Sequence, residues 1–291
     1  MTQQIPIAAA AVAAGSNADG TLAAAADIAY LRLLLVNVVF VGVPGSSDWV
    51  LVDTGLHGRS GQIRSAAARR FGADTPPRCI VLTHGHFDHV GGRDLAEAWD
   101  VPVYAHPLER PYLDGSAHYP PPDPGVGGGA VSRLSALFPT APVDLRPRLR
   151  DLPADGTLAG MPGWRWLHTP GHSVGHVSLW READRSLIAG DAVVTTASES
   201  AYAEAVQAPE IHGPPRYLTH DWQAARQSAA SIAALAPELL VTGHGRALRG
   251  GAMRDGLRLL ADRFDEIALP PRGRYLDDPQ RADDGTAYRP A

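Results

Sequence analysis

The chain has 291 residues, of which 45% are hydrophobic and 20% are charged, and its formal net charge is −5 at pH 7. These values are typical of a globular protein, and the lack of a basic stripe argues against nucleic acid as a partner. No stretch approaches the ~20 uninterrupted apolar residues of a membrane span, so no membrane partner is expected. The single cysteine, Cys79, excludes an intrachain disulfide and favours a reducing compartment, such as the cytoplasm.

The N-terminal segment, residues 1–25, is rich in alanine but carries no Lys or Arg. A secretory signal has a basic region before its apolar core, so this segment is predicted to be a poorly ordered lead-in. A single domain is then expected over residues 26–269. Its longest apolar run, 31–43, predicts one buried strand that ends at a turn over 44–47.

Acidic and imidazole side chains follow the next two apolar runs. Asp53 comes directly after 49–52. The run 79–82 is followed by a dense cluster that consists of His84, His86, Asp88 and His89. Imidazole nitrogens and carboxylate oxygens are ligands for borderline divalent metals, so the cluster predicts a metal site on the loop after a buried strand. Asp53 is our candidate for accepting a hydrogen bond from a metal-binding imidazole, although an Asp-Thr-Gly turn would also place an acid there.

The amino-acid composition changes in the middle of the chain. A short helix is expected over 91–99 and a strand over 101–105. From about residue 106 to 160 the sequence is rich in Pro and Gly, which predicts a long insertion. Because it falls between the histidine cluster and the later candidate ligands, the insertion could cover the metal site. An unstructured insertion without such a role is the alternative.

Three further metal-type residues stand where apolar strands end: His172, Asp191 and His244. Each is weak evidence alone, since a lone residue of this kind after a strand is usually structural. Together with the first cluster they are expected to converge at one edge. The C-terminal third predicts helices over 221–236 and 251–269. Residues 270–291 are expected to form an extended arm or a frayed end.

These seven positions, in their order, resemble the complete dinuclear signature of the metallo-β-lactamase-fold hydrolase superfamily, and the stretch 52–55 is similar to an early motif of that family. The resemblance covers about residues 28 to 269. It implies an αββα sandwich, in which two mixed β-sheets are flanked by helices and the metals lie at one edge. It further implies that His84, His86 and His172 bind a first metal, that Asp88, His89 and His244 bind a second, and that Asp191 bridges the two.

The resemblance narrows the activity without fixing it. Class B β-lactamases lack the bridging Asp, whereas lactonases and glyoxalase II-like thioesterases share all seven positions. The stretch 191–196 lacks the Gly-Cys-Gly-Arg of the thioesterases, and Val194 stands where many lactonases carry Tyr. Both branches stay open, and we favour a lactone or ester over a thioester.

The expected reaction is hydrolysis of an ester-like carbonyl in a small-molecule substrate by a water that bridges two divalent cations, most simply Zn²⁺, with Mn or Fe as alternatives. Asp88 or Asp191 would pass a proton to the leaving group. An iron-dependent oxidoreductase of the sulfur dioxygenase type and a non-catalytic metal-binding protein are the other classes considered. The resemblance is also compatible with a homodimer, for which the insertion and the C-terminal arm are candidate contact surfaces.

Overall fold

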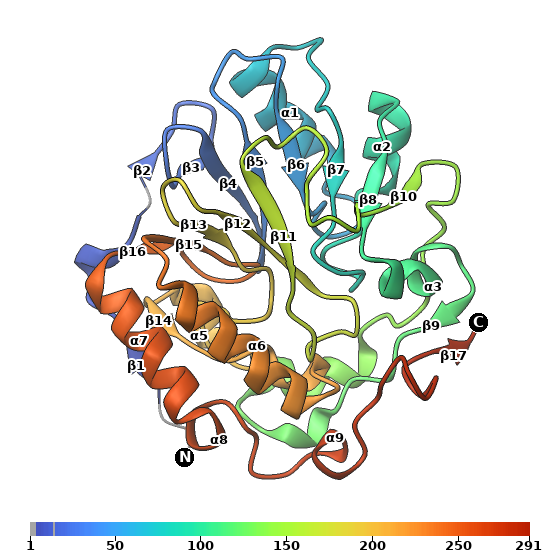
Figure 1. Cartoon of the computed structure of the whole chain (residues 1–291), viewed down its shortest axis with the longest axis vertical. Helices are drawn as coiled ribbons and strands as arrows, with labels where there is room; N and C mark the ends of the chain where they lie inside the picture. The colour runs from blue at the N-terminus through green and yellow to red at the C-terminus, as the bar shows by residue number, and fades with distance from the viewer. Residues whose placement is uncertain (1–3, 14) are drawn as a thin grey trace.

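The structure is a computed structural model that describes residues 4–13 and 15–291 (Figure 1). Its larger sheet has the strand order β10-β8-β7-β6-β5-β4-β3-β2. Strands β6, β7, β8 and β10 are parallel, and the others pair antiparallel. The bounds are β2 Gly15–Ser16, β3 Leu22–Ala23, β4 Ile28–Leu33, β5 Val36–Val41, β6 Val50–Val52, β7 Ile80–Val81, β8 Val103–Ala105 and β10 Leu149–Asp151.

The second sheet has the order β11-β12-β13-β15-β16, in which only the β13–β15 pair is parallel among the described strands. Its strands are β11 Trp164–His168, β12 Val177–Arg181, β13 Ser186–Ile188, β15 Leu239–Val241 and β16 Leu248–Arg249. Two short pairs lie outside these sheets: β1 (Ile5–Pro6) with β14 (Glu210–Ile211), and β9 (Ala117–His118) with β17 (Arg289–Pro290).

The longer helices cover the outer faces of the two sheets, and the shorter ones lie in the connections (Figure 1). The helices are α1 Ser60–Phe71, α2 Arg93–Trp99, α3 Arg110–Leu113, α4 Ala130–Leu134, α5 Ala201–Val206, α6 Trp222–Leu235, α7 Gly251–Asp262, α8 Phe264–Ile267 and α9 Arg274–Asp277. Helices α6 and α7 pack on the second sheet, and α1 and α2 pack on the larger one. No helix in the described ranges is long and apolar enough to cross a membrane.

Alternation of side chains along the strands builds three hydrophobic layers. In β15, Leu240 packs toward α6 and α7, whereas Leu239 and Val241 face the other sheet. In β6, Leu51 packs toward α1 and α2, whereas Val50 and Val52 face inward. Because successive residues of a strand point to opposite faces, both sheets are buried on both sides. The result is the predicted αββα sandwich.

The apolar run 31–43 was expected to form one strand, and this prediction was wrong. The structure instead has a β-hairpin, in which β4 and β5 are joined by Leu34 and Leu35, and Leu33 pairs with Val36. Leu34 has a φ of 61°, a conformation that such turns normally give to Gly or Asn. The turn therefore carries no sequence signal.

The helices near the C-terminus follow the predictions with one difference. Asp221 accepts a hydrogen bond from the Ala224 amide at 3.0 Å, which caps the start of α6. The expected single helix over 251–269 is divided into α7 and α8, because Arg263 leaves helical geometry with a φ of −123°. The hydrophobic stripe of both helices is nevertheless buried in one layer.

The segments at the two ends of the chain pack against the domain. In the predicted lead-in, Ile5 and Ile7 are buried, β1 pairs with β14, and β3 extends the larger sheet. The described part of this segment is therefore ordered by packing, in contrast to the prediction. Residues 1–3 and 14 lie outside the described residues. The predicted C-terminal arm runs through α9 to β17, which pairs with β9 of the insertion (Figure 1).

Candidate metal centre

The histidine cluster and Asp53 lie at the same edge of the larger sheet. Strand β7 is parallel to β6, and the cluster follows β7 just as Asp53 follows β6. Since the carboxyl ends of parallel strands meet at one edge, side chains that follow them come together. The Thr54 amide donates to the His89 carbonyl at 2.7 Å, which holds the two loops against each other.

The other three candidates come from the second sheet. His172 lies in the connection between β11 and β12, Asp191 follows β13, and His244 follows β15. The parallel pairing of β13 with β15 brings Asp191 and His244 to the same end. Asn37 of β5 joins the sheets here, because its side-chain amide donates to the Thr242 and Gly245 carbonyls at 2.9 and 2.8 Å.

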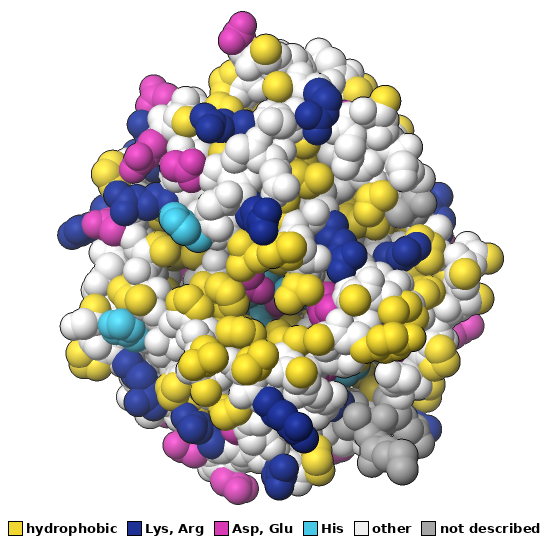
Figure 2. All heavy atoms as spheres, turned by 180° about the vertical axis from the view of Figure 1, so that it is seen from behind, with side chains coloured by type: hydrophobic (Ala, Val, Ile, Leu, Met, Phe, Trp, Pro, Cys, Tyr) yellow, Lys and Arg dark blue, Asp and Glu magenta, His cyan; other side chains and the backbone are white. Residues whose placement is uncertain are grey.

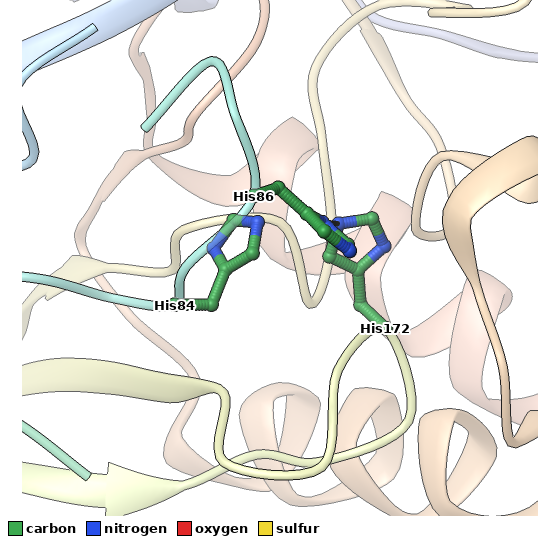
Figure 3. A group of neighbouring side chains, drawn as sticks. All are labelled: His84, His86 and His172. Carbon is green, nitrogen blue, oxygen red and sulfur yellow. Dashed lines mark hydrogen bonds between the residues drawn. The ribbon is translucent and has the colours of Figure 1, made fainter. Parts of the chain in front are cut away.

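All seven predicted ligands meet in one cluster. Each of three groups has ligand-type atoms within 4.8 Å of one another: His84, His86 and His172; His84, His89 and Asp191; and Asp88, His89 and His244. Figure 3 shows the first group, in which three imidazole rings from two loops converge. His86 Nδ1 lies 2.9 Å from His172 Nε2.

Asp191 occupies the centre of the cluster. Its Oδ2 lies 3.2 Å from His244 Nε2 and 3.5 Å from Nε2 of both His89 and His172. It therefore touches histidines of both the first and the second predicted metal positions. The backbone of Gly243 passes so close that a Cβ there would lie 2.0 Å from Asp191 Oδ1, so this position requires glycine.

Five buried donor atoms of the clustered residues lack hydrogen-bond partners in the described structure. They are Nε2 of His84, His86 and His89, and Oδ1 of Asp88 and Asp191. Buried polar atoms are normally hydrogen-bonded, so five unpartnered atoms at one place need an explanation. Nitrogen and carboxylate oxygen donors around one point fit divalent cations such as Zn²⁺, Mn²⁺ or Fe²⁺.

The protein's own charges divide the histidines into two kinds. Burial, together with the neighbouring imidazoles, holds the pKa of His84 and of His86 well below the usual value. Burial also lowers the pKa of His244, but the carboxylates of Asp191, Glu204 and Asp88 outweigh this and raise it to about 9. His172, whose pKa burial also lowers well below the usual value, joins them, so three positions present neutral imidazole, as metal binding requires, whereas at His244 a cation would replace a proton.

Most of the ligand imidazoles are held from behind by a second hydrogen bond. His89 Nδ1 lies 2.9 Å from Asp53 Oδ2, as the sequence predicted for this carboxylate. His244 Nδ1 lies 3.0 Å from the Leu35 carbonyl, and His172 Nδ1 lies 3.2 Å from Thr219 Oγ1. Such contacts fix the ring orientation and leave the other nitrogen for a metal.

The model of the Metallo-beta-lactamase superfamily matches residues 31–244 of the chain, a range that holds all seven clustered residues. The chain belongs to this superfamily. Among curated proteins, the chain is 42% identical to the "Probable metallo-hydrolase YflN" of Bacillus subtilis over 246 residues. The matched residues cover 84% of this chain and 93% of that protein. This chain is 30% identical over 205 residues to the "Probable metallo-hydrolase YybB" of the same organism, covering 70% of this chain and 78% of that protein.

Solved structures of the metallo-β-lactamase superfamily share the fold. A beta-lactamase domain protein from Burkholderia ambifaria matches with a TM-score of 0.59 at 22% identity, covering 90% of this chain and 80% of that one. The MIM-2 metallo-beta-lactamase matches with a TM-score of 0.58 at 21% identity, covering 88% and 94%. At this identity the likeness establishes the fold alone.

The most connected residue that the sequence did not reveal is Glu109, at the start of the insertion. Its Oε1 accepts from Ser173 Oγ at 2.8 Å and from the Gly175 amide at 2.7 Å. Its Oε2 accepts from the Gly85 amide at 2.9 Å and from the Tyr119 hydroxyl. One buried carboxylate therefore holds the loop of His84 and His86 against the loop of His172. No local pattern marks it, since a Glu in a Pro-rich segment is ordinarily exposed.

The insertion also borders a cavity beside the cluster. Its residues 139 and 141–144 line a cavity of about 830 Å³ together with Leu56, His57 and Phe87. Phe87 stands between His86 and Asp88, and its ring lies 5.2 Å from that of Phe138 in the insertion. The insertion contains α3, α4, β9 and β10, and so it is not an unstructured loop.

Proposed function

We propose that this chain is a dinuclear metal-dependent hydrolase that cleaves a lactone or ester. The observation that carries the proposal is the position of Asp191, whose carboxylate oxygen lies 3.2–3.5 Å from ring nitrogens of three histidines in the cluster. A carboxylate between two groups of imidazoles is suited to bridging two cations, because its charge offsets their mutual repulsion. The superfamily membership and the names of the two Bacillus subtilis relatives support hydrolysis.

In this proposal, His84, His86 and His172 would hold one cation, Asp88, His89 and His244 would hold the other, and Asp191 would serve both. A pair of bound divalent cations lowers the pKa of water and stabilises negative charge on the attacking and leaving oxygens. The nitrogen and oxygen donors fit Zn²⁺, which we propose as the native metal, and are also compatible with Mn²⁺ or Fe²⁺.

The chain's own oxygen atoms have two tasks in this reaction. The carboxylate of Asp53 holds His89, and the carbonyl of Leu35 holds His244, so that both rings face the cluster. Asp88 is the most exposed of the seven side chains, at 9%, which favours it over the others for contact with a substrate. We therefore propose Asp88 as the group that returns a proton to the leaving oxygen, with Asp191 as the alternative.

The stretch after Asp191 favours an ester or lactone over a glyoxalase II-type thioester. Residues 192–196 are all buried and none of them is charged. They therefore offer no cationic side chain for a charged thiol ester.

The proposal is tested by metal content and turnover in one preparation. Protein purified without added metal is expected to contain about two Zn²⁺ per chain by elemental mass spectrometry. It should hydrolyse members of a lactone and ester panel faster than the matching thioesters. His86→Ala and Asp191→Ala should lower kcat/KM at least 100-fold while the circular dichroism spectrum stays unchanged. Full activity in metal-depleted protein, or oxygen uptake with a single iron per chain, would overturn the proposal.

A further inference from the structure

Helix α5 has its polar and apolar sides reversed. It exposes 78% of Tyr202 and 47% of Val206 to solvent, whereas Glu204 is 1% exposed. A surface helix ordinarily turns its apolar stripe inward and its charges outward. The outer side of α5 is therefore suited to contact with something apolar.

The insertion exposes large apolar side chains as well, near α4, which begins against Glu199 just before α5. In α4 and the 3₁₀ turn that continues it, Ser132 and Ser135 are fully buried, and their hydroxyls have no partner in the described structure. Leu134 and Leu137 are 56% and 79% exposed. Leucines that stay exposed while nearby serines are buried depart from the usual distribution of side chains, so this surface is suited to contact with something apolar.

The β4–β5 hairpin tip adds a third exposed apolar segment. Leu34 and Leu35 are 57% and 38% exposed, and Leu34 has a φ of 61°. Positive φ is costly for a residue with a bulky side chain, and such conformations gather at functional sites. Six of the eight large hydrophobic side chains described as exposed belong to these three segments. We call these six the apolar rim: Leu34, Leu35, Leu134, Leu137, Tyr202 and Val206.

Each segment of the apolar rim contacts a side chain of the metal cluster or its neighbour. The Leu35 carbonyl lies 3.0 Å from His244 Nδ1, and Glu204 of α5 lies 3.8 Å from the same nitrogen. Phe138, directly after Leu137, packs on Phe87 of the histidine loop. In Figure 2, hydrophobic side chains surround a central depression in which His and acidic side chains are visible.

We propose that the substrate carries an extended apolar group, such as a medium-length acyl or alkyl chain, which lies on the apolar rim while its carbonyl reaches the metal cluster. This rests on the function proposed above and specifies its substrate class. Because the three segments border the cluster, a group that projects from a carbonyl at the metals can lie against one of them. When an apolar chain lies there, its apolar surface and that of the rim are both removed from water, and the hydrophobic effect stabilises the complex.

The test is a chain-length series on metal-loaded protein. Binding of straight-chain carboxylates, from butanoate to decanoate, is measured by calorimetry, and hydrolysis is measured with p-nitrophenyl esters of the same acids. Affinity and kcat/KM are expected to rise about two- to fourfold for each CH₂ that reaches the rim. Leu137→Ser and Tyr202→Ser should lower decanoate affinity about five- to tenfold and leave butanoate binding unchanged. Leu259→Ser is the matched control, because Leu259 is also exposed, at 39%, but lies on α7.

The outcomes separate this inference from the proposed function. A flat chain-length series in the wild-type protein, or an equal effect of Leu259→Ser, would overturn the inference. So would a wild-type dimer that Leu137→Ser and Tyr202→Ser convert to a monomer in sedimentation velocity, because a second copy would then cover the rim. If carboxylate affinity rises with chain length but no ester or lactone is hydrolysed, the apolar ligand class stands and the proposed hydrolysis fails.

Discussion

Asp53 forms more hydrogen bonds than is usual for a residue in a short turn. It has a φ of 60° and is 3% exposed. It accepts from the amide and the hydroxyl of Thr83 at 2.8 Å each, and it lies 2.9 Å from His89 Nδ1. A left-handed conformation at a buried acid is unfavourable by itself, so the contacts must outweigh it. The strained backbone of Asp53 therefore places the carboxylate that orients His89, a candidate metal ligand.

Replacing this carboxylate should weaken metal binding at the position of His89. Asp53→Asn cannot accept from both the imidazole and Thr83 in the same way, so His89 loses its fixed orientation. We expect the affinity for the second metal equivalent to fall about 10- to 100-fold, as measured by competition with a chelator. Asp48→Asn is the control, since Asp48 pairs with Arg78 at the surface. Unchanged affinity in Asp53→Asn would show that Asp53 is an ordinary turn residue.

Glu210 predicts a pH dependence of stability that is separate from the metal cluster. Burial and the nearby Glu199 raise the pKa of Glu210 to about 7, from an ordinary value of 4.5. The folded state therefore binds this proton more tightly than the unfolded state does. As a result, stability from this group is lost as the pH rises from 4.5 to 7. Glu210→Gln should raise the free energy of unfolding by about 1–3 kcal/mol at pH 8 and change it little at pH 4.

Urea unfolding of both proteins at pH 4 and pH 8 measures this effect. An equal difference at the two pH values would mean that the substitution acts through packing, because only ionisation of Glu210 makes the gain depend on pH. Glu238→Gln serves as the comparison, since Glu238 forms an ion pair with Arg254 at the surface.

At the scale of elements, the insertion supports the metal cluster through Glu109. Glu109→Gln keeps the size of the side chain but replaces one accepting oxygen by a donor, which then faces donors such as Ser173 and the Gly175 amide. The loops of His84, His86 and His172 should separate. We expect the affinity for the first metal equivalent to fall about tenfold and the affinity for the second to change less. Titration with Co²⁺, followed by its visible spectrum, measures both affinities.

Tyr119→Phe provides a graded comparison, since it removes one of the four donors to Glu109 and leaves the others. The affinity of Tyr119→Phe for the first metal equivalent should lie between that of the wild type and that of Glu109→Gln. Equal loss of both metal equivalents in Glu109→Gln, together with a lower melting temperature, would instead indicate general unfolding of this edge.

The elements differ in how well the sequence predicts them. The seven clustered residues and Asp53 could be identified because each follows an apolar run, and a strand end is a local signal. Glu109 could not, because its partner Ser173 is 64 residues away. The β4–β5 turn was missed because Leu34 takes a conformation typical of Gly. Helix α1 was not among the predicted elements, and its run of small and charged residues gives only a weak apolar stripe.

For the whole molecule, the metal cluster stands where the two sheets meet. His84, His86, Asp88 and His89 come from the larger sheet, whereas His172, Asp191 and His244 come from the second one. In the absence of cations, the carboxylate of Asp191 is compensated by His244 and His89, which hold its pKa well below the usual range although burial alone would raise it. Cations bound here would therefore join the two halves of the sandwich as well as serve chemistry.

Metal removal should consequently destabilise the entire fold and not only the loops. A ligand that binds only the folded state at 1,000 times its Kd contributes about 4 kcal/mol, and in a chain of this size each kcal/mol shifts the Tm by about 2–4 °C. We expect chelation of the metal-loaded protein to lower the Tm by about 10 °C in differential scanning calorimetry. In Asp191→Ala the same chelation should lower it far less, because that variant has lost the side chain placed between the two metal positions. A Tm that does not change when two bound metals are removed would mean that the sheets are held together by their apolar layer alone, with the cluster contributing nothing to their association.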